Sequence, residues 1–281
     1  MDLVQAQSWS YMPGIPSEIG ALRGLLQTYS EISEDDIDKH LFNIRAKAWN
    51  VSQTPSIGRW KFLTLMNRDD ELYQEILFRL KLPQSQAAIL DLGCGLGQVL
   101  RQLRSDGVPG LKLFGTDVSS ELIEIGYEMF RDRYTLGATF VLGDMIDPDD
   151  NRLSKLQGQV TVVIADSFFH LFTWTQQLYI GKRLVGFFKP GTHNATIIGR
   201  HAGVISNNKS PAVFRASNSP RAEPFLHDQR TFQQLWDEVG KLTSTRWHVE
   251  SQQDGSLSDQ LPGIEPGVVP MRFTIRQIPH R

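Results

Sequence analysis

From residue 87 onward the sequence alternates short apolar runs with longer stretches of helical periodicity, and this alternation restricts the fold more than any other feature. Continuous apolar runs of this length are typical of parallel strands covered by helices on both faces. The last two runs follow one another directly, which predicts an antiparallel terminal hairpin. We therefore predict an α/β fold with a doubly wound, mostly parallel seven-stranded sheet. The strands are expected within residues 87–92, 111–117, 138–144, 160–166, 194–199, 245–251 and 271–278.

The first third of the chain lacks such runs and shows helical periodicity instead. Ser17 is a candidate N-cap for a first helix, and Ser33 with Asp36 has the spacing of a capping box for a second one. We predict that residues 1–82 form an N-terminal helical lid or cap. The ligand-binding sheet domain is then expected to comprise residues 83–281.

The composition matters mainly for what it excludes. A formal net charge of −2 over 281 residues offers no clustered basic surface of the kind that nucleic acids require. The single cysteine, Cys94, excludes an internal disulfide and disfavours a thiolate metal site, so we expect no metal. No basic leader with an apolar core begins the chain, and no run approaches ~18 apolar residues. We expect a cytoplasmic protein without membrane insertion; its oligomeric state, homodimer included, stays open.

A glycine-rich turn, DLGCGLG at residues 91–97, follows the first predicted strand. Such a turn lets the backbone approach a ligand closely at the carboxyl end of a parallel sheet. Dinucleotide sites prefer the spacing G-x-G-x-x-G, which is one residue longer at the last step, so a dehydrogenase is disfavoured. An acid, Asp117, ends the next strand and can accept hydrogen bonds from ribose hydroxyls. A further acid, Asp144, follows the third strand.

In this order, the glycine turn, Asp117 and the Gly-Asp pair at 143–144 resemble the pattern of class I S-adenosylmethionine (SAM) methyltransferases over residues ~85–278. The resemblance implies a Rossmann-like fold, bound SAM and methyl transfer. It places the methionine part of SAM near residues 91–97 and the adenine near Asp144. Cys94 is interpreted as a small residue of the tight turn, not as a nucleophile. The implied cofactor-binding residues are Asp91, Gly93, Cys94, Gly95, Gly97, Gln98, Asp117, Val118, Asp144, Met145, Asp166 and Ser167.

The segment IADSFFHLFTW at residues 164–174 follows the fourth strand, where class I enzymes place the methyl acceptor. Its aromatic side chains suit a lipophilic substrate, although several of them can equally pack in the core. A long polar stretch at residues 200–230 is the predicted acceptor loop. The predicted catalytic residues are His170, Arg200 and His201, and the predicted substrate-binding residues are Phe169, Trp174, Arg200 and His227. Alternatively, each of these histidines has a purely structural role, and Arg200 is a solvated loop residue; both alternatives remain open.

Four segments together look like fungal biosynthetic methyltransferases of polyketide–terpenoid (meroterpenoid) pathways: SIGRWKFLTL, GVPGLKLFGTDVSSELIEIGYEMFRDR, DSFFHLFTW and GRHAG. Asp166, Thr173 and His201 depart from the relatives' usual residues. The resemblance implies O-methylation of a carboxylate on a small, lipophilic polyketide–terpenoid intermediate, with formation of a methyl ester. Alternatives are O-methylation of a phenol with a histidine base, and a SAM-fold cyclase or isomerase that does not methylate.

Overall fold

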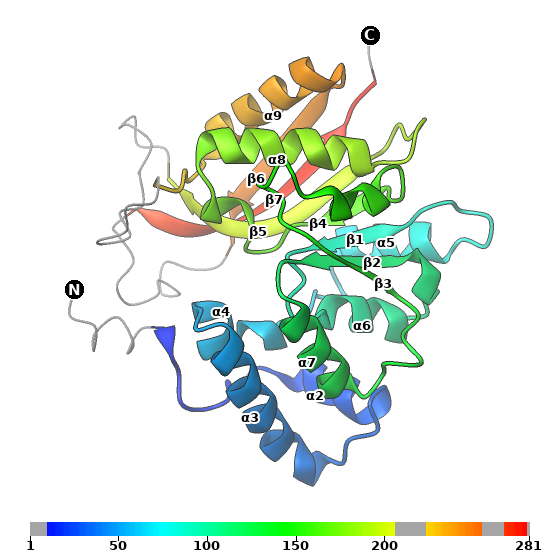
Figure 1. Ribbon diagram of the computed structural model, residues 1–281, viewed down its shortest axis with the longest axis vertical. Coiled ribbons are helices and arrows are strands. Elements are labelled where there is room, and N and C mark those ends of the chain that lie inside the picture. Colours follow the sequence, from blue (N-terminus) through cyan, green and yellow to red (C-terminus); the bar gives the residue numbers. More distant parts are fainter. Residues whose placement is uncertain (1–9, 206–222, 255–266, 280–281) are drawn as a thin grey trace. The chain divides into compact units, whose positions relative to one another are not determined.

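The computed structural model describes residues 10–205, 223–254 and 267–279, and the chain divides into two compact units, Met1–Leu142 and Gly143–Arg281 (Figure 1). Within the described residues the seven strands form a mixed, mostly parallel sheet, as the apolar runs predict. None of the described helices is long and apolar enough to cross a membrane.

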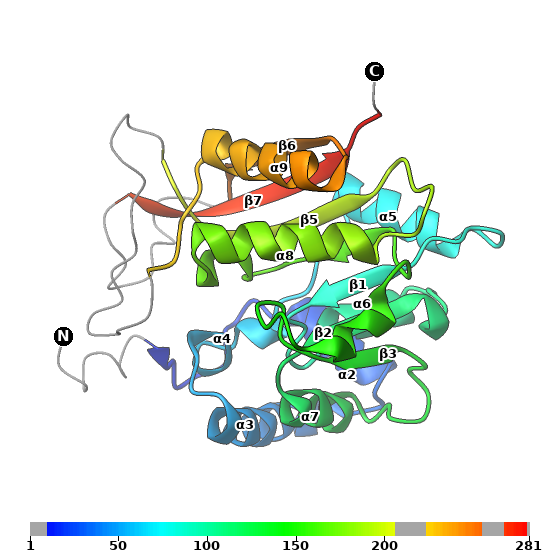
Figure 2. The ribbon, with the colours of Figure 1, turned by 45° about the horizontal axis from the view of Figure 1, so that its top comes forward.

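The first unit begins with helices and continues into three parallel strands (Figure 2). Its N-terminal elements are α2 (Gly20–Thr28), α3 (Glu34–Val51), α4 (Pro55–Gly58), the 3₁₀ helix η1 (Lys61–Leu63) and α5 (Glu71–Lys81). The sheet elements are β1 (Ile89–Leu92), α6 (Gln98–Ser105), η2 (Gly110–Lys112), β2 (Leu113–Asp117), α7 (Ser120–Phe130) and β3 (Thr139–Leu142). The strand order is β3-β2-β1, and both pairs are parallel.

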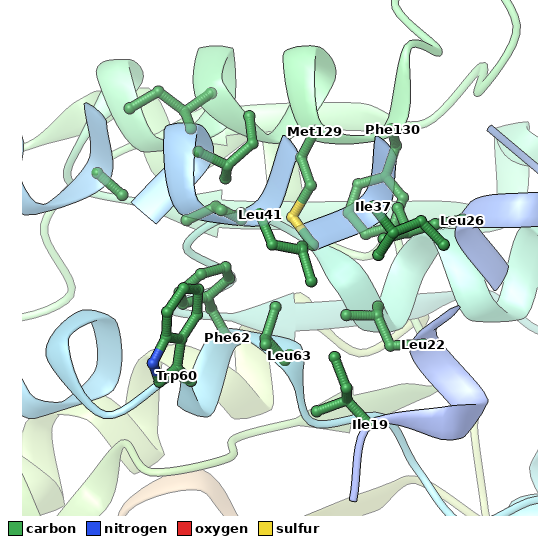
Figure 3. Close-up of a cluster of buried hydrophobic side chains, with 14 of the residues drawn as sticks. Ile19, Leu22, Leu26, Ile37, Leu41, Trp60, Phe62, Leu63, Met129 and Phe130 are labelled. Carbon is green, nitrogen blue, oxygen red and sulfur yellow. The ribbon is translucent and has the colours of Figure 1, made fainter. Parts of the chain in front are cut away.

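The N-terminal helices share a hydrophobic core with α7, which belongs to the sheet part of this unit (Figure 3). Leu22 of α2 and Leu41 of α3 are fully buried, and they gather with Met129 and Phe130 of α7. Complete burial of each such side chain contributes about 1.5–3 kcal/mol. Trp60 closes one end of the cluster and donates its Nε1 proton to the Met12 carbonyl at 3.0 Å. The cluster therefore fixes the helices to the face of α7.

Two details of the helix starts differ from the expected ones. Ser17 does not cap the first helix: α2 begins at Gly20 with Ile19 at the N-cap, where its side chain joins the buried cluster. Ser33 does occupy the N-cap of α3, but its hydroxyl donates to Asp36 at 2.6 Å and not to the backbone. The proposed boundary at residue 82 stays a prediction.

The second unit carries the remaining four strands in the order β4-β5-β7-β6. Its elements are η3 (Asn151–Leu156), β4 (Val162–Ile164), η4 (Phe169–Leu171), α8 (Trp174–Phe187), β5 (Thr196–Val204), α9 (Gln229–Thr243), β6 (Trp247–Gln253) and β7 (Val268–Gln277). β4 and β5 are parallel, whereas β7 runs antiparallel to both β5 and β6, which confirms the terminal hairpin. Helices α8 and α9 lie side by side, and α9 packs on β6 (Figures 1 and 2).

Candidate functional site

The glycine turn of the first unit connects β1 to α6 with three residues in the left-handed region. Gly93, Gly95 and Gly97 have φ values of 69°, 53° and 69°, which L-residues with side chains adopt only at a cost. The amides of Gly93 and Cys94 both donate to the carbonyl of Thr116, at 2.8 and 3.0 Å. The turn is therefore bound to the end of the neighbouring strand β2.

Asp117, the last residue of β2, binds the same turn through its side chain. Its Oδ2 accepts the amide proton of Gly95 at 2.8 Å, and its Oδ1 accepts that of Ser119 at 3.0 Å. Each carboxylate oxygen has a second lone pair, so Asp117 keeps acceptor capacity for ligand hydroxyls. The next residue, Val118, is 69% exposed although it is apolar. The structure thus brings a carboxylate and an exposed apolar side chain to the edge of the glycine turn.

Two features of this edge suit a bound ligand. A Cβ added to Gly95 would meet no atom within 4 Å, so open space adjoins the turn at that position. The Oε1 atom of Gln98 is buried and has no hydrogen-bond partner among the described residues. A buried acceptor of this kind is costly unless a donor reaches it. A ligand with a cationic amine and a ribose fits this set of groups, which is the chemistry of SAM.

Cys94 lies inside the turn with its side chain buried. Burial, followed by the nearby Asp91 and Asp117 carboxylates, raises the pKa of its thiol well above the usual value. A neutral, enclosed thiol is a poor nucleophile. A Cβ on Gly115 would come 3.1 Å from the sulfur, so Cys94 fills space against β2. The sequence interpretation of Cys94 as a small turn residue agrees with this packing.

The predicted adenine-side residues, Asp144 and Met145, lie in a turn that begins the second unit. The Oδ1 of Asp144 accepts the Ile146 amide at 3.0 Å, and Met145 is buried. The guanidinium of Arg183, on α8, donates to the carbonyls of Asp144 and Met145 at 3.0 and 3.3 Å. The Asp144 amide donates to Asp150 at 2.8 Å. Arg183 and Asp150 were not predicted from the sequence, because both residues hold the turn at Asp144 and Met145 and neither belongs to a recognisable sequence motif.

Asp166 and Arg200 form an ion pair in the second unit, where β4 and β5 are neighbours. Arg200 donates to Asp166 through Nε at 3.2 Å and through Nη2 at 3.0 Å, and its backbone amide donates to Oδ1 at 2.9 Å. Burial opposes the charge on Arg200, but Asp166 and then Asp254 outweigh it and raise the pKa of the guanidinium. Ser167, at φ 54°, donates its amide to the Arg200 carbonyl at 2.6 Å. Both ion-pair side chains remain partly exposed.

His201 and His227 are buried in the same unit with their ring centres 6.3 Å apart. Burial, together with the neighbouring His227 and His170, lowers the pKa of His201 well below its ordinary value. Burial also lowers the pKa of His227, to about 3. His227 is held by Gln177 Oε1 at 2.8 Å and Thr231 Oγ1 at 3.2 Å. Both histidines are therefore neutral near pH 7.

The predicted aromatic substrate residues divide into a core residue and a surface residue. Phe169 is fully buried, and its ring packs against Phe232, Trp236 and Phe273. Trp174, at the start of α8, is half-buried and donates its indole proton to Glu238 at 3.3 Å. Phe169 thus supports the site from within the core, while Trp174 remains accessible. Residues 206–222 of the predicted acceptor loop lie outside the described residues.

The chain matches two family models, one for each part of the sequence. A model described as a meroterpenoid methyltransferase N-terminal domain covers residues 10–63, and one described as a methyltransferase domain covers residues 89–191. Within the described residues, no group of three or more histidine, cysteine or acidic side chains is arranged to hold a metal ion. The mostly parallel α/β fold, the glycine turn with Asp117 and the methyltransferase match define the protein as a SAM-dependent methyltransferase.

Curated relatives narrow this class. The chain is 33% identical to O-methyltransferase phiE of a fungal species, over 84% of this chain and 76% of phiE. It is 34% identical to O-methyltransferase atr3 of Stereocaulon alpinum, over 84% of this chain and 67% of atr3. It is also 34% identical to the asnovolin E/chermesin D methyltransferase nvfJ of Aspergillus novofumigatus, over 84% of this chain and 83% of nvfJ. The chain belongs to this family of fungal secondary-metabolite methyltransferases.

Proposed function

We propose that the protein methylates a carboxylate oxygen of a small, lipophilic polyketide–terpenoid intermediate and so forms a methyl ester. The names of phiE and atr3 specify O-methyl transfer, and the name of nvfJ connects methyl transfer with asnovolin E and chermesin D. The match of residues 10–63 to a meroterpenoid methyltransferase domain supports the same substrate class. The choice of a carboxylate over a phenol is supported by residues of the second unit.

When bound, SAM would supply the methyl group that an acceptor oxygen takes, with S-adenosylhomocysteine as the leaving group. In the proposed site the backbone of the glycine turn would hold the methionine part, Gln98 Oε1 would accept from its amine, and Asp117 would accept from the ribose hydroxyls. Val118 offers an apolar surface beside Asp117. Asp91 is buried in β1, one residue before the strand ends, and is proposed to bind the methionine part together with the glycine turn. In the second unit, the resemblance implies Asp144, Met145, Asp166 and Ser167 as further cofactor-binding residues.

The lowered pKa values of His201 and His227 favour a carboxylate acceptor. A phenol with a pKa near ~10 is almost fully protonated at neutral pH and needs a general base. A histidine with a pKa of about 3 is a weak base for that proton. A carboxylic acid with a pKa near ~4 is already ionised and needs only a group that orients it. The two buried histidines are thus suited to packing and orientation, not to proton removal.

Arg200 is the proposed orienting group. Its Nε and Nη2 each donate one proton to Asp166, and within the described residues Nη1 has no hydrogen-bond acceptor, so Nη1 is the proposed donor to an acceptor carboxylate. The guanidinium is planar and permanently charged, and its side chain is 41% exposed, so a ligand can reach it. Asp166 holds the guanidinium plane in place but also offsets its charge. We therefore expect Arg200 to orient the acceptor more than to attract it from solution.

One residue supports the phenol alternative. His170 lies on η4, close enough to lower the pKa of its neighbour His201 by charge repulsion, and it is only half-buried. A half-buried histidine next to the acceptor is the arrangement that a general base requires. If the acceptor is a phenol, His170→Ala should cost about 10²–10⁴ in kcat.

Product chemistry tests the proposal directly. The enzyme is supplied with methyl-labelled SAM and with two acceptors that share a prenylated aromatic skeleton, one bearing a carboxylic acid and the other only a phenol. A methyl ester releases labelled methanol in mild alkali, whereas an aryl methyl ether does not. We expect label in methanol, a kcat that is constant from pH 6 to 8, and a larger loss for Arg200→Ala than for His170→Ala.

Exposed residues of the same type provide matched controls. Arg246→Ala, just before β6, and His248→Ala on β6 remove the same chemical groups from exposed side chains, and we expect neither to alter turnover. Alkali-stable label, together with a kcat that rises with pH and loses this rise in His170→Ala, would replace the carboxylate proposal with the phenol one. Consumption of the acceptor without any label in the product would instead indicate the cyclase or isomerase alternative.

A further inference from the structure

We propose, on the basis of the proposed SAM site, that Arg101 is a positioning residue for the glycine turn and that helix α2 controls it through Tyr29 and Asp132. Arg101 lies on α6, one turn after the glycine turn, and its side chain is fully buried. It does not touch the edge at which the ligand is proposed to bind. Its influence on SAM must therefore pass through the backbone that it holds.

The guanidinium of Arg101 divides its protons between the turn and a buried carboxylate. Nη1 donates to the carbonyl of Leu96 at 3.0 Å and to that of Gly97 at 3.4 Å. Nε and Nη2 donate to the two oxygens of Asp132 at 2.9 and 3.1 Å. Because a peptide unit is planar and trans, a carbonyl held toward Arg101 directs the next amide away from it. Arg101 thus sets the orientation of the two peptide planes that enter α6.

The absence of a side chain at Gly97 agrees with this assignment. A Cβ at Gly97 would lie 2.5 Å from Nη1 of Arg101, so the guanidinium occupies the space that a side chain would need. The rings of Tyr127, Phe130 and Phe140 surround the guanidinium, with its central carbon 5.0–5.4 Å from their centres. A flat cation matches this aromatic enclosure better than an ammonium group does.

Tyr29 connects this arrangement to the N-terminal helices. It follows α2 directly, and its hydroxyl donates to Oδ2 of Asp132 at 2.9 Å. Burial and then Asp132 raise the pKa of Tyr29, so the hydroxyl stays protonated and remains a donor. Asp132 is itself buried and needs these donors, because a buried carboxylate is costly unless it is paired and hydrogen-bonded.

The position of Tyr29 depends in turn on the hydrophobic cluster of the first unit. Leu22 and Leu26, on α2, pack in that cluster together with Phe130 of α7, two residues before Asp132 (Figure 3). The order of contacts runs from this packing to Tyr29, then to Asp132 and Arg101, and finally to the glycine turn. A change at Tyr29 should therefore reach the turn although Tyr29 has no bond to it.

The chain offers a matched control for Tyr29. Tyr73 on α5 is a buried tyrosine whose hydroxyl also donates to a carboxylate, that of Asp106, and burial followed by Asp106 raises its pKa as well. Asp106 lies at the far end of α6 from the glycine turn. Tyr29→Phe and Tyr73→Phe each remove one oxygen atom and one tyrosine–aspartate bond. Only the first should affect the turn.

The experiment measures two properties of the full chain that do not require turnover. The affinity for SAM is measured by calorimetry, and amide hydrogen exchange is measured on the glycine-turn peptide without ligand. We expect Tyr29→Phe to weaken SAM binding about three- to tenfold and to speed exchange in the turn, because the lost bond involves a charged partner. Tyr73→Phe should leave both properties at the wild-type level.

Arg101→Lys distinguishes positioning from simple charge compensation. A lysine keeps the positive charge beside Asp132 but replaces three nitrogens by one, so the loop carbonyls lose their donor. We expect this variant to fold, to bind SAM at least about tenfold more weakly and to exchange faster in the turn. If Arg101→Lys does not fold, Tyr29→Phe decides the question. Asp117→Ala is measured in parallel to test the SAM site itself.

The outcomes separate the two levels of the proposal. Unchanged SAM affinity in Asp117→Ala would refute the placement of SAM at the turn. A second outcome is that Asp117→Ala weakens SAM binding, whereas Tyr29→Phe and Tyr73→Phe both keep the wild-type SAM affinity and the wild-type hydrogen exchange in the glycine turn. This outcome would refute the positioning role and leave the SAM site in place. Equal losses in Tyr29→Phe and Tyr73→Phe would show a general effect of stability and would also refute it.

Discussion

Replacing Gly126 by alanine tests how closely α7 and the glycine turn must approach each other. Gly126 lies within α7, where a Cβ would stand 2.2 Å from the carbonyl oxygen of Leu96 and 3.0 Å from its carbonyl carbon. Leu96 is buried, and its carbonyl accepts from Arg101, so the turn has little freedom to move away. The added methyl group must therefore displace either the helix or the turn.

The magnitude follows from two opposing contributions. Alanine is more favourable than glycine inside a helix by about 0.8–1 kcal/mol. Overpacking costs about 1–3 kcal/mol, and a contact with backbone belongs in the upper part of that range. We expect Gly126→Ala to lower the free energy of unfolding by about 1–2 kcal/mol. A displaced turn should also weaken SAM binding, since the turn provides the backbone surface of the proposed site.

Gly24 provides the matched control for this prediction. It lies within α2, and a Cβ there would meet nothing within 4 Å. Gly24→Ala should therefore stabilise the protein by up to about 1 kcal/mol through helix propensity alone. Urea unfolding measures stability for both variants, and calorimetry measures SAM affinity. A Gly126→Ala protein as stable as Gly24→Ala, with unchanged SAM affinity, would refute the reasoning about the close approach.

Two further predictions concern buried titratable groups. Cys94 should react with a disulfide reagent at pH 8 far more slowly in the native protein than in urea, because its thiol is enclosed and its pKa is raised; rapid stoichiometric reaction of the native protein would contradict this. For His227, the unfolded chain binds a proton below about pH 6.5, whereas the folded chain does so only near its pKa of about 3. The stability it contributes is therefore complete above pH 6.5 and is lost as the pH falls, by about 2 kcal/mol at pH 5. Urea unfolding at both pH values should show this loss, and His227→Gln should reduce it; an equal loss in that variant would place the effect elsewhere.

The strands and the glycine turn were predictable because their signals are local. An apolar run is visible within a few residues, and the three glycines of the turn sit where the backbone adopts positive φ. The first helix start was not predictable in the same way. Ser17 has the right chemistry for a cap, but α2 begins at Gly20 because Ile19 is drawn into the buried cluster. Tertiary packing outweighed the local capping preference at that position.

The acceptor residues show where prediction from sequence ended. Their position after β4 and along β5 could be inferred from the strand order, but their environment could not. His227 is held by Gln177, fifty residues earlier, and Phe169 owes its burial to rings on α9 and β7. The cofactor role of Asp166 stays a prediction, and the ion pair that its carboxylate forms with Arg200 could not be inferred from the sequence. Contacts between distant segments determine these pKa values and exposures, and no pattern in one segment records them.

The N-terminal third illustrates the same limit with a functional consequence. The N-terminal lid stays a prediction, and α6, which begins at the glycine turn, is bound to this part of the chain at several points. The Gln102 amide exchanges two hydrogen bonds with the backbone of Met66, at 2.8 and 2.9 Å, and Asp106 binds Arg68 through both carboxylate oxygens. Gln102 is buried, so deletion of its partner would leave an unsatisfied amide in the interior. The Gln102 contacts and the Tyr29–Asp132–Arg101 contacts thus join α6 to residues that precede β1, whereas the Arg68–Asp106 contact holds the end of α6 that is far from the glycine turn. Tyr29, which lies within the residues 10–63 that match the meroterpenoid methyltransferase N-terminal domain, binds Asp132, the partner of Arg101, and so gives that domain a physical link to the proposed cofactor turn.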